Sequence, residues 1–91
     1  MKKRTIPNDI YGMRIIYKNP ANPDDTETAY KIRNILAHNY ETRDAISDDY
    51  IENPKSNNYR SLHLYIYYQM LVEIQIRSNL MDIGAKSDDY Y

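Results

Sequence analysis

Two neighbouring segments in which apolar and polar side chains alternate place the strongest constraint on the fold. In SLHLYIYY, residues 61–68, the apolar positions are Leu62, Leu64, Ile66 and Tyr68. In LVEIQIR, residues 71–77, they include Val72, Ile74 and Ile76. Successive side chains of a β-strand point to opposite sides of a sheet, so a period of two residues is typical of a half-buried strand. The sequence therefore predicts two strands, each with one apolar and one polar face.

The two strands are predicted to form an antiparallel hairpin whose register follows from their apolar faces. Pairing Leu64 with Ile74 and Ile66 with Val72 places these side chains on one face, and it requires an odd number of residues in the turn. The polar faces then meet as well: Tyr65 lies beside Glu73, His63 beside Gln75 and Ser61 beside Arg77. An ordinary solvated sheet face and a binding surface are both compatible with this patch.

One strand and one helix are predicted before the hairpin. The apolar, β-branched segment 13–17 is followed by turn-forming residues, which predicts a buried strand from Met13 to Tyr17. Residues 26–39 are predicted to be helical, with Asp24 and Glu27 at the spacing of a capping box. Apolar side chains recur there at helical spacing, namely Ala29, Ile32, Ile35, Leu36 and Tyr40.

The remaining segments complete the expected order of elements. Residues 41–58 are polar, contain Pro54 and show no period, which predicts a long loop that is either functional or disordered. A second helix is predicted to begin after Ser78. The resulting fold class is α/β (α+β), with a mixed sheet flanked by helices.

Size and composition exclude several classes of protein. The 91 residues contain no internal repeat, so one domain spanning residues 1–91 is expected. The absence of cysteine excludes disulfides and cysteine-based zinc sites, and it fits a reducing cytoplasm. With 12 basic and 13 acidic residues, the net charge of −1 favours neither DNA nor an acidic membrane as a partner. No apolar run approaches the roughly 20 residues of a membrane span, so we expect a cytoplasmic protein without an export signal.

The segment just before the first hairpin strand carries side chains that suit a nucleotide. Lys55 offers a point charge for phosphate, Asn57 offers an amide, and Tyr59 offers an exposed ring on which a base could stack. These residues enter the same edge of the polar patch that contains His63. Ordinary turn chemistry is the alternative explanation for Lys55 and Asn57.

Two carboxylates are candidates for a metal site. Asp9 precedes the first predicted strand, and Glu73 lies on the polar face of the hairpin. Mg²⁺ prefers a few carboxylates together with waters and substrate phosphates, so this pair could hold it. A helix cap or a surface position is the alternative explanation for Asp9.

A family resemblance covers most of the chain. The runs DIYGMR, DYIENPKSNNYRSLH, VEIQIRS and MD occur in the order and spacing of the synthetase domain of the RelA/SpoT family, the alarmone synthetases that make (p)ppGpp. The matching blocks together span residues 9–85. The resemblance implies a nucleotidyltransferase-like fold and a GTP pyrophosphokinase activity. Such enzymes transfer pyrophosphate from ATP to the ribose 3′-hydroxyl of GTP or GDP, using Mg²⁺.

The resemblance also implies roles for individual residues. Tyr59 would stack on guanine, and Lys55, Asn57 and His63 would contact the acceptor nucleotide. Asp9 and Glu73 would hold the metal, and Glu73 would also take the proton of the 3′-hydroxyl. Two more residues match the motif: Arg77, which would brace the site or meet phosphate, and Gln75, which would support its neighbours.

The sequence departs from the family pattern at several positions. Asp48 stands where a basic residue is usual, Asn58 where glycine is, Ser78 where threonine is, Gly84 where tryptophan is and Asp89 where histidine is. Only eight residues precede Asp9, whereas family synthetases carry basic, ATP-binding helices there. The acceptor half of the site is therefore expected to be present and the donor half missing, so ATP is doubtful as a partner.

Three hypotheses follow. The chain acts as a synthetase with help from a homo-oligomer or a separately encoded N-terminal piece. Alternatively, it is an inactive module that binds guanine nucleotides, or a decayed fragment of a synthetase.

Overall fold

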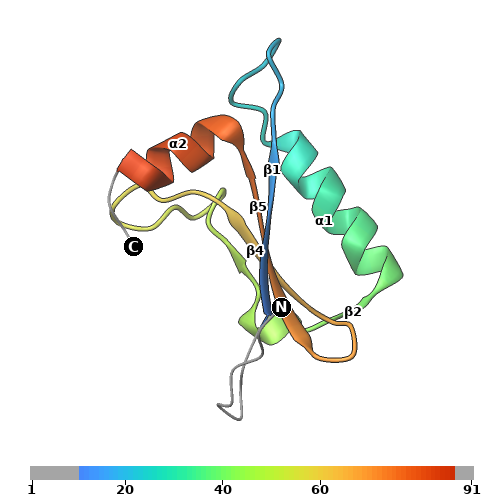
Figure 1. Cartoon of the computed structure of the whole chain (residues 1–91). Helices are drawn as coiled ribbons and strands as arrows, with labels where there is room; N and C mark the ends of the chain where they lie inside the picture. The colour runs from blue at the N-terminus through green and yellow to red at the C-terminus, as the bar shows by residue number, and fades with distance from the viewer. Residues whose placement is uncertain (1–10, 88–91) are drawn as a thin grey trace.

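In the computed structural model, the described residues are 11–87, and they form a mixed β-sheet with one helix on each side (Figure 1). The strands are β1 (Tyr11–Tyr17), β2 (Glu41–Thr42), β3 (Asp48–Asp49), β4 (Leu62–Tyr67) and β5 (Leu71–Ser78). The helices are α1 (Glu27–Asn39), the short 3-10 helix η1 (Asp44–Ile46) and α2 (Asn79–Ser87). The predicted fold class, a mixed sheet with flanking helices, is confirmed.

The sheet is built around the predicted hairpin. The strand order is β1-β5-β4-β2. β2 and β3 pair with the same edge of β4: β2 with its C-terminal half and β3 with its N-terminal half. β1 runs parallel to β5, and the remaining pairs are antiparallel. Leu64 lies opposite Ile74, Tyr65 opposite Glu73 and His63 opposite Gln75, which confirms the predicted register. The turn consists of residues 68–70, an odd number, as this register requires.

The apolar face of the hairpin forms the core against α1. Ala29 of α1 is fully buried against this face, and Ile32 and Leu36 pack at its margin. The strands contribute the other buried members of the cluster, namely Leu62, Leu64, Ile66, Ile74 and Ile76. Burial of apolar surface stabilises a fold by roughly 25 cal/mol per Å². The apolar face of the hairpin therefore stays packed against α1, and the opposite face is available to polar side chains.

The start and the outer side of α1 differ from the prediction. Asp25, not Asp24, caps the helix: its Oδ1 accepts a hydrogen bond from the Thr28 backbone N–H at 3.1 Å. Asp24 instead pairs with Arg60 at 2.7 Å. Ile35 is 63% exposed, because it lies about 100° around the helix from its neighbour Leu36 and so falls outside the buried stripe. Tyr40 is also exposed and packs against the ring of Tyr68.

Two other segments correct the prediction. β1 was expected to be buried, yet Met13 is 53% and Ile16 is 43% exposed. Within the described residues β1 is an edge strand, and α1 packs on β4 and β5 instead. Residues 41–58 were expected to be a loop, but they contain β2, η1 and β3. Two-residue strands leave too short a pattern to recognise, and their pairing comes from the open edge of β4.

α2 begins immediately after β5, as predicted, and lies on the opposite side of the sheet from α1 (Figure 1). The Ser78 hydroxyl caps the helix by accepting a hydrogen bond from the Met81 backbone N–H at 3.1 Å. Met81 and Ala85 are buried. Asp82 forms an ion pair with Arg77 of β5 at 2.7 Å, and both side chains are almost completely buried. Neither helix of the described range has the length and apolar character needed to cross a membrane.

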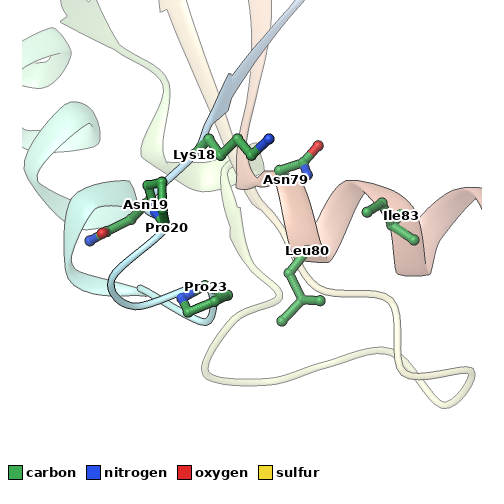
Figure 2. A pocket seen from close by; sticks show the side chains of 7 residues that line it. All are labelled: Lys18, Asn19, Pro20, Pro23, Asn79, Leu80 and Ile83. Carbon is green, nitrogen blue, oxygen red and sulfur yellow. The ribbon is translucent and has the colours of Figure 1, made fainter.

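A small hollow separates α2 from the loop that follows β1 (Figure 2). It has a volume of about 120 Å³. Figure 2 shows its lining side chains, which are Lys18, Asn19, Pro20, Pro23, Asn79, Leu80 and Ile83. This lining holds one cation and no carboxylate or imidazole, so it does not provide the groups of a catalytic site.

The ion pair between Arg77 and Asp82 should dominate the attachment of α2. Asp82→Asn leaves the buried guanidinium without its counter-charge, and we expect a loss of about 3–5 kcal/mol in the free energy of unfolding. The matched control is Asp24→Asn, which removes the carboxylate of the exposed Arg60–Asp24 pair and should cost about 0–1 kcal/mol. Urea denaturation of both variants measures the difference. Equal losses would contradict this assignment.

Candidate functional site

The polar face of the β4–β5 hairpin collects most of the predicted site residues. β4 supplies His63, and β5 supplies Glu73, Gln75 and Arg77 on the same face because of the register. The segment between β3 and β4 adds the predicted residues Lys55, Asn57 and Tyr59, together with Tyr50, to which the prediction gave no role. The site is thus assembled from one hairpin and the loop that leads into it.

A tight turn brings Lys55 back across from Tyr59. The Lys55 backbone N–H donates to the Tyr59 carbonyl oxygen at 3.2 Å, and the Asn58 N–H donates to the Lys55 carbonyl oxygen at 2.8 Å. Asn58 has a φ of 66°, a left-handed conformation that asparagine adopts more readily than most residues. The Asn57 side-chain oxygen accepts from the Tyr59 N–H at 3.4 Å. Asparagine thus fulfils the turn requirement where the family pattern has glycine.

A chain of hydrogen bonds runs from Arg77, which is paired with Asp82, through the Tyr59 hydroxyl to His63. Arg77 Nη1 donates to the Tyr59 hydroxyl oxygen at 3.1 Å, and that oxygen lies 2.8 Å from His63 Nε2. Because the hydroxyl accepts from Arg77, its own proton is available to Nε2. With Nε2 as the acceptor, neutral His63 carries its ring proton on Nδ1, which lies 3.6 Å from Glu73 Oε2.

Burial keeps the His63 imidazole neutral. The low polarity of its surroundings lowers the pKa of His63 below the usual 6.5, and the cations Lys55 and Arg77 lower it further. The carboxylates of Glu73 and Asp48 act in the opposite direction without reversing the shift. At pH 7 the imidazole therefore acts as a hydrogen-bonding group and not as a cation.

Glu73 has one oxygen engaged and one oxygen available. Tyr65 donates its hydroxyl proton to Glu73 Oε2 at 2.8 Å, and burial together with this bond raises the pKa of Tyr65 to about 12. Among residues 11–87, no side chain or backbone group donates a hydrogen bond to Glu73 Oε1. That oxygen is therefore available to a metal ion or to a substrate proton.

An open hollow of about 270 Å³ borders Glu73. Its lining comes from β1 and β5, namely Gly12, Met13, Arg14, Glu73 and Gln75. Gly12 lies opposite Glu73 in the register, and a side chain there would meet nothing within 4 Å. Arg14 lies opposite Gln75 and is exposed. The prediction assigned no role to Arg14, because its place in the site depends on the parallel pairing of β1 with β5.

The predicted metal site is only partly described. Asp9 lies outside the described residues, so its pairing with Glu73 stays a prediction. In the described part of the chain, no three histidine or acidic side chains gather closely enough to hold a metal ion. Mg²⁺ is commonly bound by one or two carboxylates, with waters and phosphate oxygens completing its shell. The available oxygen of Glu73 fits that mode of binding.

Tyr59 and Arg77 are both buried, which revises what the prediction expected of them. Tyr59 was expected to present an exposed ring, but the residue is only 7% exposed. Its ring is covered by Tyr50 and His63 at its edges and by the cations of Lys55 and Arg77. Arg77 is fully buried, so it braces the site instead of reaching an incoming phosphate.

Three other predicted residues lie close to Tyr59 or Arg77. Asn57 is exposed beside Tyr59, and Lys55 is exposed above it. Gln75 accepts a long hydrogen bond from Arg77 Nη1 at 3.4 Å. Lys55, Tyr59, His63 and Glu73 therefore converge, with Arg77 and Gln75 beneath them.

Comparison with known proteins identifies relatives of this chain. A family model described as "Region found in RelA / SpoT proteins" matches residues 2–89. The bifunctional (p)ppGpp synthase/hydrolase SpoT of Escherichia coli K12 is 36% identical over 80 residues, which cover 86% of this chain and 10% of SpoT. The GTP pyrophosphokinase YwaC of Bacillus subtilis is 36% identical over 87 residues, which cover 86% of this chain and 39% of YwaC.

Solved structures of small alarmone synthetases have a similar fold. Small alarmone synthetase 1 from Bacillus subtilis, in a crystal structure bound to its product pppGpp, superimposes with a TM-score of 0.62 at 28% identity. The match covers 85% of this chain and 41% of that one. Small alarmone synthetase 2 from the same organism gives a TM-score of 0.60 at 34% identity, with 85% and 44% covered. The chain spans less than half of each relative's length, and it belongs to the RelA/SpoT family.

Proposed function

We propose that this chain forms the acceptor-nucleotide side of a (p)ppGpp synthetase. The observation that carries the proposal is the convergence of Lys55, Tyr59, His63 and Glu73 on one face of the sheet. A cation for phosphate, an aromatic ring for the base and a carboxylate for the ribose hydroxyl are the groups that a guanine nucleotide acceptor needs. The family relationship supports GTP or GDP as that acceptor, since a solved relative is bound to pppGpp.

Glu73 is the residue best placed to activate the acceptor. Pyrophosphate transfer joins the ribose 3′-oxygen to the β-phosphorus of ATP and breaks the bond between the α- and β-phosphates, so AMP leaves. The 3′-hydroxyl proton must go to a base, and Glu73 Oε1 accepts no hydrogen bond from the described residues. Tyr65 holds the second oxygen and so fixes the orientation of the carboxylate.

Mg²⁺ is part of this proposal through the same carboxylate. Glu73, together with Asp9, would hold the ion, which neutralises charge on the transferred phosphates. Arg14 lies across the hollow from Glu73, and its exposed guanidinium is available to a phosphate group there. This residue is a candidate for contact with the donor nucleotide.

A second candidate function is guanine-nucleotide binding without transfer. It is favoured by the converging side chains of Lys55, Tyr59 and His63, which suit a guanine nucleotide without requiring ATP. Both candidates require the same acceptor surface, and they differ only in whether ATP is used.

Magnesium-dependent binding tests the role of Glu73. We expect the 91-residue chain to bind GDP weakly, and Glu73→Gln to leave GDP affinity within about twofold when Mg²⁺ is absent, because glutamine is isosteric with glutamate and loses only the charge. Any gain in affinity on adding Mg²⁺ should disappear in this variant. Glu41→Gln, at an exposed position of β2, is the control. Calorimetric titration measures each affinity.

Transfer of labelled pyrophosphate from ATP to GTP separates the two candidates. Transfer that is lost in Glu73→Gln would establish the synthetase, whereas GDP binding without transfer would favour the binding module. No GDP binding by the unmodified chain would contradict both.

A further inference from the structure

The ammonium group of Lys55 occupies the space between two tyrosine rings. Its Nζ atom lies 4.8 Å from the centroid of the Tyr50 ring and 5.4 Å from that of Tyr59. The two ring centroids are 5.9 Å apart, and the Tyr50 ring also meets the edge of His63. Within residues 11–87, no ion pair joins Lys55 to a carboxylate. The cation is thus held by the ring faces.

A base cannot stack on Tyr59 until a covering group moves. Only 7% of Tyr59 is exposed. Arg77 is fixed, since it is fully buried and bound to Asp82. His63 is held by its hydrogen bond to the Tyr59 hydroxyl. The half-buried Tyr50 is held by ring contacts with both Tyr59 and His63. Lys55 is the exposed member of the set and is held by cation–π contacts, which are weak at an exposed site. Moving Lys55 therefore costs least.

We infer that Lys55 makes the site selective for nucleotides over nucleosides. In the free protein its ammonium covers the Tyr59 ring, and it leaves the ring only when a phosphate group offers a stronger contact. A charge-assisted contact with phosphate exceeds an exposed cation–π contact, so a nucleoside diphosphate compensates for the displacement. A nucleoside without phosphate gains no such compensation. This inference rests on the proposed function, because it takes Tyr59 as the base-stacking ring.

Removal of the Lys55 side chain should change the two affinities in opposite directions. In Lys55→Ala, guanosine should bind about two- to fivefold more tightly, because the ring no longer has to be uncovered. GDP should bind about tenfold or more weakly, because its phosphate loses a cation. Titrations of the full chain with guanosine and with GDP, both without Mg²⁺, keep the metal site out of the comparison.

Two control variants sharpen the test. Lys55→Arg keeps a cation that contacts both rings and phosphate, so it should retain the preference for GDP. Lys31→Ala removes an exposed lysine of α1 and should change neither affinity. If Lys55→Ala binds GDP more weakly but guanosine no more tightly, the inference is overturned and the proposed function stands. If no variant binds GDP, the proposed function fails and the inference fails with it.

Discussion

The buried guanidinium of Arg77 holds the parts of this structure together. It is fully buried, pairs with Asp82 of α2 and donates to the Tyr59 hydroxyl. A buried charge is costly unless it is paired and hydrogen-bonded, so the surroundings of Arg77 must be arranged around it. One side chain thereby fixes α2 against β5 and sets the position of the ring that the site depends on.

The register of the hairpin determines which side chains share the polar face of the sheet with Arg77. A shift of one residue would turn Glu73 and His63 toward the core, and the apolar cluster against α1 prevents it. The same alternation that buries Ile74 therefore presents Glu73 and Gln75 on the other face. Stability and site geometry are two results of one pattern, which explains why a chain of 91 residues can carry both.

Alternation and spacing were sufficient for the hairpin, its register, α1, α2 and the placement of His63, Glu73, Gln75 and Arg77 on one face of the sheet. The features that alternation and spacing did not predict depend on tertiary contacts. The exposure of Met13 follows from the edge position of β1, and the role of Arg14 follows from pairing between strands that lie far apart in the sequence. The burial of Tyr59 could not be read from a polar loop, because Arg77 and Tyr50 reach it from other elements.

The account depends most on base stacking against Tyr59, and GDP affinity in two variants tests it directly. Tyr59→Phe keeps the ring but, like Tyr59→Leu, loses the hydroxyl that contacts Arg77 and His63, so the difference between the two variants reports on the ring. The phenylalanine variant should bind GDP the more tightly of the two. Tyr59→Leu keeps an apolar side chain but removes the ring, and it should bind about five- to 150-fold more weakly than the phenylalanine variant, which is the contribution of stacking one base. Circular dichroism would verify that both variants fold. Equal GDP affinities for the phenylalanine and leucine variants would contradict the acceptor site described for this face.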